Sequence, residues 1–146
     1  MTPDLLFQVA QTGAMTGWVA LALSPLRPRP LLAYGGIAVP VALSLLYLGT
    51  VAVALPGADG GFDTLAGVMA LFAQPGPALA GWVHFLAFDL AIGGWQAREA
   101  RRLGLPHWAL LPCLFLTLML GPVGLLAFLG LRAGFTHFGG RKEALS

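Results

Sequence analysis

The chain has 146 residues, of which 58% are hydrophobic and only 10% are charged, and its mean hydropathy is +0.81. A soluble domain typically carries about 25% charged residues, so this composition excludes an ordinary soluble protein and indicates an integral membrane protein. The net charge of +2 comes without a basic face, which argues against nucleic-acid binding. The single cysteine, Cys113, excludes an intrachain disulfide and a cysteine-rich metal site.

Four apolar segments are long enough to cross a bilayer, which takes roughly 20 mostly apolar residues in a helix. They are residues 5–23, 31–55, 79–97 and 107–132. Residues 62–73, between the second and third segments, are apolar but too few to cross, and they predict a short interfacial or re-entrant helix. The expected fold is therefore all-α: a single polytopic domain, residues 1–146, with four transmembrane helices. The N-terminus lacks the basic region of a signal peptide, so we expect the first segment to be retained.

The positions of the arginines predict the orientation. Residues 24–30 and 98–106, the first and third links, hold five arginines, and basic links face the cytoplasm. Four crossings then place both termini outside, although Arg132, Arg141 and Lys142 conflict with this because they would also lie outside. The rich use of Ala, Gly, Leu and Arg indicates a bacterial source, and hence a bacterial inner membrane.

Two ionisable residues lie inside the third segment. With a rise of 1.5 Å per residue, Asp89 falls about 2 Å from the bilayer midplane and His84 about 6 Å toward the outer side. A carboxylate at that depth is costly and is normally buried in the bundle. Two interpretations of Asp89 stay open: it exchanges protons or contacts a ligand, or it hydrogen-bonds neighbouring helices. His84 lies roughly 140° around the helix from Asp89, and it has the same two interpretations.

Polar side chains of the other segments fall at similar depths. Gln11 and Tyr47 are predicted at the same depth in the bilayer as His84. Thr12, Ser44 and Thr117 are predicted within roughly 4 Å of the midplane. Gln8, Gln11, Thr12 and Thr16 share one face of the first helix, which is expected to turn toward other helices. We therefore expect Gln11, Ser44, Tyr47, His84, Asp89 and Thr117 to converge in one central belt.

Small residues and prolines predict how the helices meet. The pairs Gly35-Gly36 and Gly93-Gly94 favour close helix contacts. Pro40 and Pro122 each lack an N–H, which frees the carbonyls of Gly36 and Leu118 for other donors.

Residues 82–132 carry a specific motif. They contain the run WVHFLAFDL, then GGW, an arginine-rich turn, LP and finally LTLMLGPVGLL. In order and spacing this region resembles the signature of the neoxanthin-synthase-like (abscisic-acid-deficient-four-like) membrane proteins. Seven residues match motif positions: His84, Asp89, Trp95, Arg98, Thr117, Gly121 and Pro122.

The resemblance implies a four-helix membrane protein that acts in carotenoid or xanthophyll chemistry. In plants the family is tied to the formation of neoxanthin from violaxanthin, an isomerisation that opens an epoxide. Such a reaction needs an acid to protonate oxygen and a base to remove a proton from carbon, roles that a carboxyl and an imidazole can fill. We expect Asp89 and His84 as catalytic residues and Gly121 and Pro122 as structural ones. The expected ligand-binding residues are Gln11, Tyr47, Trp82, Phe85, Phe88 and Thr117.

Other functions stay open. One alternative is a non-enzymatic subunit packed against a larger membrane complex, for example a photosynthetic one. Another is a small transporter, which the single ionisable residue at the midplane disfavours. A bis-histidine haem is disfavoured because His84 and His107 differ in depth by on the order of 20 Å, and one His with one Asp offers too few ligands for a metal. Expected partners are membrane lipid and a carotenoid-like isoprenoid, with no other cofactor and no nucleic acid.

Overall fold

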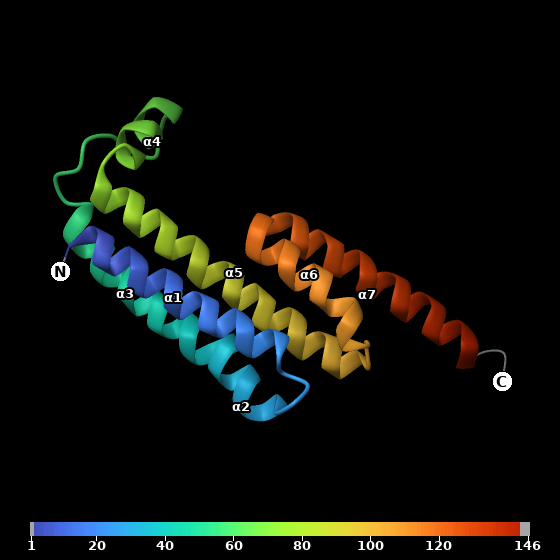
Figure 1. Cartoon of the computed structure of the whole chain (residues 1–146). Coiled ribbons are helices and arrows are strands. Elements are labelled where there is room, and N and C mark those ends of the chain that lie inside the picture. The colour runs from blue at the N-terminus through green and yellow to red at the C-terminus, as the bar shows by residue number, and fades with distance from the viewer. Residues whose placement is uncertain (1, 144–146) are drawn as a thin grey trace.

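The structure is a computed structural model that describes residues 2–143, and its architecture is all-α (Figure 1). A π-helical segment, η1, joins two of the helices into one continuous rod. In chain order the elements are α1 (Pro3–Ala22), α2 (Pro28–Ala33), η1 (Tyr34–Ala38), α3 (Val39–Ala54), α4 (Leu65–Phe72), α5 (Pro75–Leu103), α6 (His107–Leu120) and α7 (Pro122–Glu143).

Three of the predicted membrane-spanning helices are present. Pro3–Ala22, Pro28–Ala54 and Pro75–Leu103 are long and apolar enough to cross a bilayer, which supports an integral membrane protein. The short helix predicted between the second and third spans is also confirmed, as α4. Its first turn is capped by Thr64, whose hydroxyl accepts a hydrogen bond from the N–H of Gly67.

The predicted fourth span, residues 107–132, is not one continuous helix. The chain breaks at Gly121, whose φ of +32° is a conformation that other residues rarely adopt, and Pro122 then begins α7. Helix α6 is an apolar helix of only 14 residues, or about 21 Å, short of the roughly 30 Å hydrocarbon layer. Helices α6 and α7 pack against each other as a hairpin (Figure 1). Pro122 thus accompanies a chain reversal and not a kink.

The hairpin also changes the expected orientation. Figure 1 shows that the chain begins at the end of the bundle near α4, whereas α7 runs back toward the opposite end, where α2 and the end of α5 lie. Arg132 of α7 forms an ion pair there with Glu99 of α5, at 3.1 Å. Arg132, one of the basic residues that conflict with four crossings, therefore lies toward the same end as the arginines of the first and third links. The expectation that both termini share one side depended on a fourth crossing, which the hairpin does not make.

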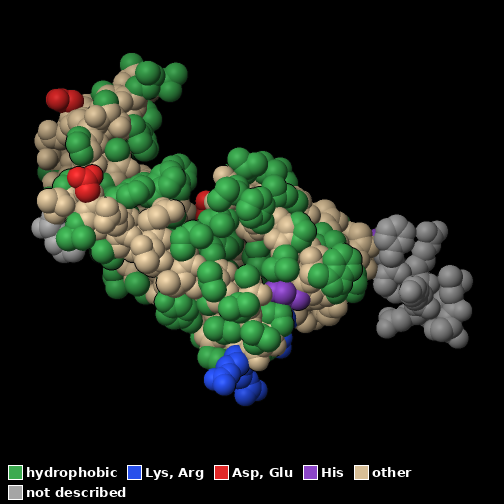
Figure 2. Space-filling view, in the orientation of Figure 1, with side chains coloured by type: hydrophobic (Ala, Val, Ile, Leu, Met, Phe, Trp, Pro, Cys, Tyr) green, Lys and Arg blue, Asp and Glu red, His purple; other side chains and the backbone are tan. Residues whose placement is uncertain are grey.

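Helix α5 is the centre of the fold and contacts every other described helix. Its closest neighbour is the α2–α3 rod, where Gly36 and Gly94 bring the two backbones together. A Cβ at Gly36 would lie 3.0 Å from the Cα of Gly94, so neither position has room for a side chain. The close helix contact predicted from the glycine pairs is confirmed. At the α2 end, arginine side chains gather on the surface, whereas acidic side chains show near α4 (Figure 2).

The carbonyl of Gly36, which Pro40 leaves without its usual helical donor, accepts a hydrogen bond from a side chain of α5. Because Pro40 has no N–H, the usual helical bond to Gly36 is missing, and the chain widens locally into η1. The guanidinium Nη1 of Arg98 donates to this carbonyl at 3.2 Å. The same arginine side chain therefore ties α5 to the irregular turn of the neighbouring rod.

Candidate functional site

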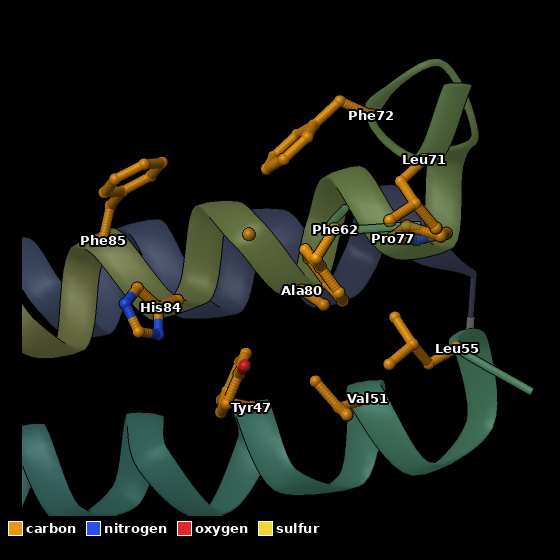
Figure 3. A pocket seen from close by; sticks show the side chains of 11 residues that line it. Tyr47, Val51, Leu55, Phe62, Leu71, Phe72, Pro77, Ala80, His84 and Phe85 are labelled. Atoms are coloured by element: carbon orange, nitrogen blue, oxygen red, sulfur yellow. The ribbon is translucent and has the colours of Figure 1, made fainter. Parts of the chain in front are cut away.

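A cavity of about 300 Å³ lies between α3, α4 and α5 (Figure 3). Residues of the link before α4 complete its wall. Its lining residues are Tyr47, Val51, Leu55, Phe62, Leu71, Phe72, Pro77, Ala80, Gly81, His84 and Phe85. The cavity is therefore mostly apolar, with polar side chains only at one end.

That polar end is formed by Tyr47 of α3 and His84 of α5. Their rings meet edge to face, with centroids 5.3 Å apart. His84 also stacks on Phe88 at 4.6 Å and meets the edge of Phe85 at 6.1 Å. Within the described part of the chain, neither the Tyr47 hydroxyl nor the His84 ring has a hydrogen-bond partner. Both groups are thus free to bond a ligand in the cavity.

Asp89 lies outside the cavity, at the tip of the α6–α7 hairpin. A Cβ on Gly121 would lie 2.7 Å from its Oδ1 atom, so the carboxyl group packs directly against the break between α6 and α7. Asp89 is half-buried and follows Phe85 by four residues on the same face of α5. Because Phe85 lines the cavity, a ligand that leaves the cavity past Phe85 would next meet Asp89.

The remaining candidate residues lie in two other places. On the α1 side of α5, the indole N–H of Trp82 donates to Oε1 of Gln11 at 3.0 Å, and Trp82 packs on Phe7 with ring centroids 5.8 Å apart. Neither Trp82 nor Gln11 lines the cavity. Ser44 donates to the carbonyl of Pro40 in its own helix. The expected central belt is therefore divided among separate faces of α5.

Thr117 belongs to a buried network that fastens the hairpin to α5. The Gln96 amide Nε2 donates to Thr117 Oγ1 at 3.0 Å and to the Gly124 carbonyl at 3.3 Å. The Thr117 hydroxyl lies 2.8 Å from the carbonyl of Cys113, to which it donates. Gln96 and Thr117 are both fully buried. This network therefore connects α5 to α6 and α7 in the interior of the protein.

Sequence reasoning missed Gln96, although a signal was present. Gln96 follows Asp89 by seven residues, and this spacing puts both residues on one face of the helix. That face is the one the hairpin covers. His107 has a structural role that its sequence context does not indicate, since its Nε2 atom donates to the carbonyl of Ala22 at the end of α1, at 2.8 Å. This bond links the start of α6 to α1.

The comparisons with known proteins agree with the resemblance of residues 82–132. The model of the ABA DEFICIENT 4-like (ABA4-like) family matches residues 5–128, which include the first two spans as well as the motif region. No curated protein and no solved structure matches the chain significantly. Since the family model covers most of the sequence, the chain belongs to the ABA DEFICIENT 4-like family.

Proposed function

We propose that this protein takes a carotenoid-like isoprenoid from the lipid phase into the cavity between α3, α4 and α5, and isomerises it at the end of the cavity where His84 and, just outside, Asp89 lie. The observation that supports this most directly is the cavity itself, which is apolar along its length and ends in two unpartnered polar groups, Tyr47 and His84. A largely apolar pocket with a few convergent polar groups is the usual form of a small-molecule site. Family membership favours the same class of ligand.

The proposed chemistry is a redox-neutral isomerisation. His84 accepts a proton from a ring or chain carbon, the electron pair of that C–H bond forms a new carbon–carbon double bond, and the carbon–oxygen bond of an epoxide breaks. Protonated Asp89 donates its proton to the departing oxygen, which becomes a hydroxyl group. Transfer of the proton from His84 back to Asp89 restores both groups, so no other reactant is consumed.

Tyr47 is expected to orient the ligand through its hydroxyl group. The chain contains only two tyrosines. The other one, Tyr34, does not line the cavity, and its hydroxyl is hydrogen-bonded to that of Thr16 on α1 at 2.9 Å. Tyr47→Phe removes one oxygen atom from the proposed site, and Tyr34→Phe removes the same atom elsewhere. This pair of variants separates a site effect from a general effect on the protein.

The experiment starts with protein purified in mild detergent from cells that make carotenoids. We expect a bound pigment with a banded visible spectrum, and a product of the same mass as an added epoxy-carotenoid. Tyr47→Phe and His84→Ala should lose pigment or turnover, while Tyr34→Phe retains both. Absence of both pigment and product in the wild-type protein would contradict the proposal.

A second function, a non-enzymatic subunit of a larger membrane complex, is favoured by one observation. The hairpin covers only part of α5, and in the uncovered part Phe85 and Phe88 are 55% and 59% exposed. A protein partner could cover this surface. Pigment without turnover, together with co-purification of a defined membrane complex under mild extraction, would favour this alternative.

A further inference from the structure

We infer that the cavity receives one ring end of a long isoprenoid, while the rest of the ligand runs along the uncovered face of α5 and into lipid. This inference rests on the proposed function and specifies which part of the ligand the protein recognises. It predicts selectivity for an oxygen-bearing ring, not for the polyene chain.

The volume of the cavity sets the first limit. An apolar cavity of about 150 Å³ holds one benzene molecule, and this cavity measures about 300 Å³. It therefore has room for a single substituted ring and the first atoms attached to it. A whole two-ring polyene of about bilayer length is far too large, so most of such a ligand must lie outside the cavity.

The walls decide where the rest of the ligand can go. At the α4 end, the link before α4 closes the cavity, and Gln74 holds that link in place. Its Nε2 atom donates to the carbonyl of Asp59 at 2.8 Å, and its Oε1 accepts from the N–H of Asp59 at 3.2 Å. Opposite, α3 and α5 pack together. Phe72 of α4 and Phe85 of α5 both line the cavity, and their rings stand on the same side of α5, so we place the exit of the ligand between them (Figure 3).

The outer face of α5 continues from this exit as a groove. The surface is hollowed between α4 and the α6–α7 hairpin (Figure 2). Along α5, Phe85 and Phe88 are exposed, and Asp89 at the hairpin tip ends the groove. From Pro77 to Asp89 the helix rises about 18 Å, which is little more than half of a hydrocarbon layer of about 30 Å. The site therefore accommodates one half of a bilayer-length ligand.

The polar groups then select the ring. Tyr47 and His84 have no hydrogen-bond partner in the described chain, and a polar group in an apolar environment is costly without one. A ring that carries an oxygen atom satisfies them, whereas an acyclic hydrocarbon chain leaves both unpaired. Recognition of one ring also means that the two ends of a symmetric ligand bind in separate events.

Competition between ligands tests the inference on the wild-type protein. The purified protein is loaded with a two-ring xanthophyll, and retention of the pigment is measured against three competitors: the same xanthophyll, a single-ring oxygenated fragment such as an ionone, and an acyclic carotene of full length. We expect the single-ring fragment to displace the pigment and the acyclic carotene to fail. Displacement by the acyclic carotene, or failure of the fragment at saturating concentration, would overturn the inference and leave the proposed function standing.

A pair of variants tests the location. Val51→Phe adds bulk to the cavity wall, and Val41→Phe makes the same change on the exposed surface of the same helix, away from the cavity. Overfilling the cavity should weaken pigment binding by about tenfold or more, whereas Val41→Phe should bind like the wild type. Equal binding by both folded variants would overturn the inference. If the wild type binds none of the ligands, the inference and the proposed function both fail.

Discussion

At the scale of single residues, the structure separates the two ionisable side chains of the central helix. His84 faces the cavity with Tyr47, whereas Asp89 lies against Gly121 at the tip of the hairpin. The proposed isomerisation needs both of them, one at the cavity and one just outside it. A helix N-terminus such as that of α7 attracts a carboxyl group, so Asp89 could equally serve to hold the hairpin tip. A single substitution distinguishes these roles.

Asp89→Asn is expected to leave folding and pigment retention intact and to reduce turnover at least about 100-fold, because an amide cannot exchange a proton. Asparagine keeps a donor and an acceptor of the same size as the carboxyl group. Product formation and thermal unfolding in detergent should be measured on the same preparation. Full turnover would exclude proton transfer by Asp89, and a misfolded variant would show that the carboxyl group is needed for assembly.

At the scale of elements, packing depends on a few places where helices touch closely or share a buried polar contact. Gly36 and Gly94 let the α2–α3 rod approach α5, and the Gln96–Thr117 network joins the hairpin to the same helix. These contacts lie on different faces of α5. Each can therefore be weakened separately.

Gly94→Ala is expected to destabilise the bundle by about 1–3 kcal/mol, because the added methyl group would collide with the backbone of Gly36. Gly49→Ala is the matched control, since a Cβ at Gly49 meets nothing within 4 Å. Replacing a helical glycine at such a position should be neutral or stabilising by about 0.5–1 kcal/mol. Thermal unfolding of both variants provides the measurement, and equal stabilities would contradict the close contact.

Thr117→Val keeps the shape of the side chain but removes the hydroxyl group that pairs with Gln96. An unsatisfied buried amide costs about 1–3 kcal/mol, so we expect a loss of stability of this size and easier proteolysis near Gly121. Thr136→Val serves as the control, because Thr136 is exposed and bonds only carbonyls of its own helix. A change of less than about 0.5 kcal/mol is expected there. Similar effects of both substitutions would argue against a special role for the buried network.

At the scale of the whole molecule, three candidate spans followed by a hairpin predict an odd number of membrane crossings. The arginines of the first and third links and Arg132 then share one side, as the preference of basic residues for the cytoplasmic side requires. The N-terminus and the link that holds α4 lie on the other side. This arrangement removes the conflict that four crossings create.

Labelling of single cysteines should show this topology. With Cys113 replaced by alanine, we expect a cysteine at Ala58 to react with a membrane-impermeant reagent from outside, and cysteines at Leu26 and Thr136 to react only after the membrane is permeabilised. Both positions are exposed: Leu26 precedes Arg27 in the first link, and Thr136 follows Arg132 by about one turn of α7. Labelling of Thr136 together with Ala58 would instead support four complete crossings.

Local sequence patterns were enough to predict an all-α integral membrane protein and the positions of three candidate spans and of α4. These features follow from the length and hydropathy of local segments, which need no tertiary information. The glycine pairs and Pro40 also had local physical consequences, a close approach and a freed carbonyl, that were predictable from residue type. The motif in residues 82–132 was specific enough to indicate the family.

The reversal at Gly121 and the distribution of the polar side chains depend on how the helices pack, and local sequence does not specify this. A Gly-Pro pair within apolar sequence fits either a kinked span or a hairpin, and the choice depends on what packs against it, here α5 with Asp89 and Gln96. Depth along a helix was readable from the sequence, but the direction in which each side chain points around the axis depends on how the helices are rotated against one another. For that reason Tyr47 and His84 meet at the cavity, while Gln11 pairs with Trp82, and Thr117 with Gln96, on other faces of α5.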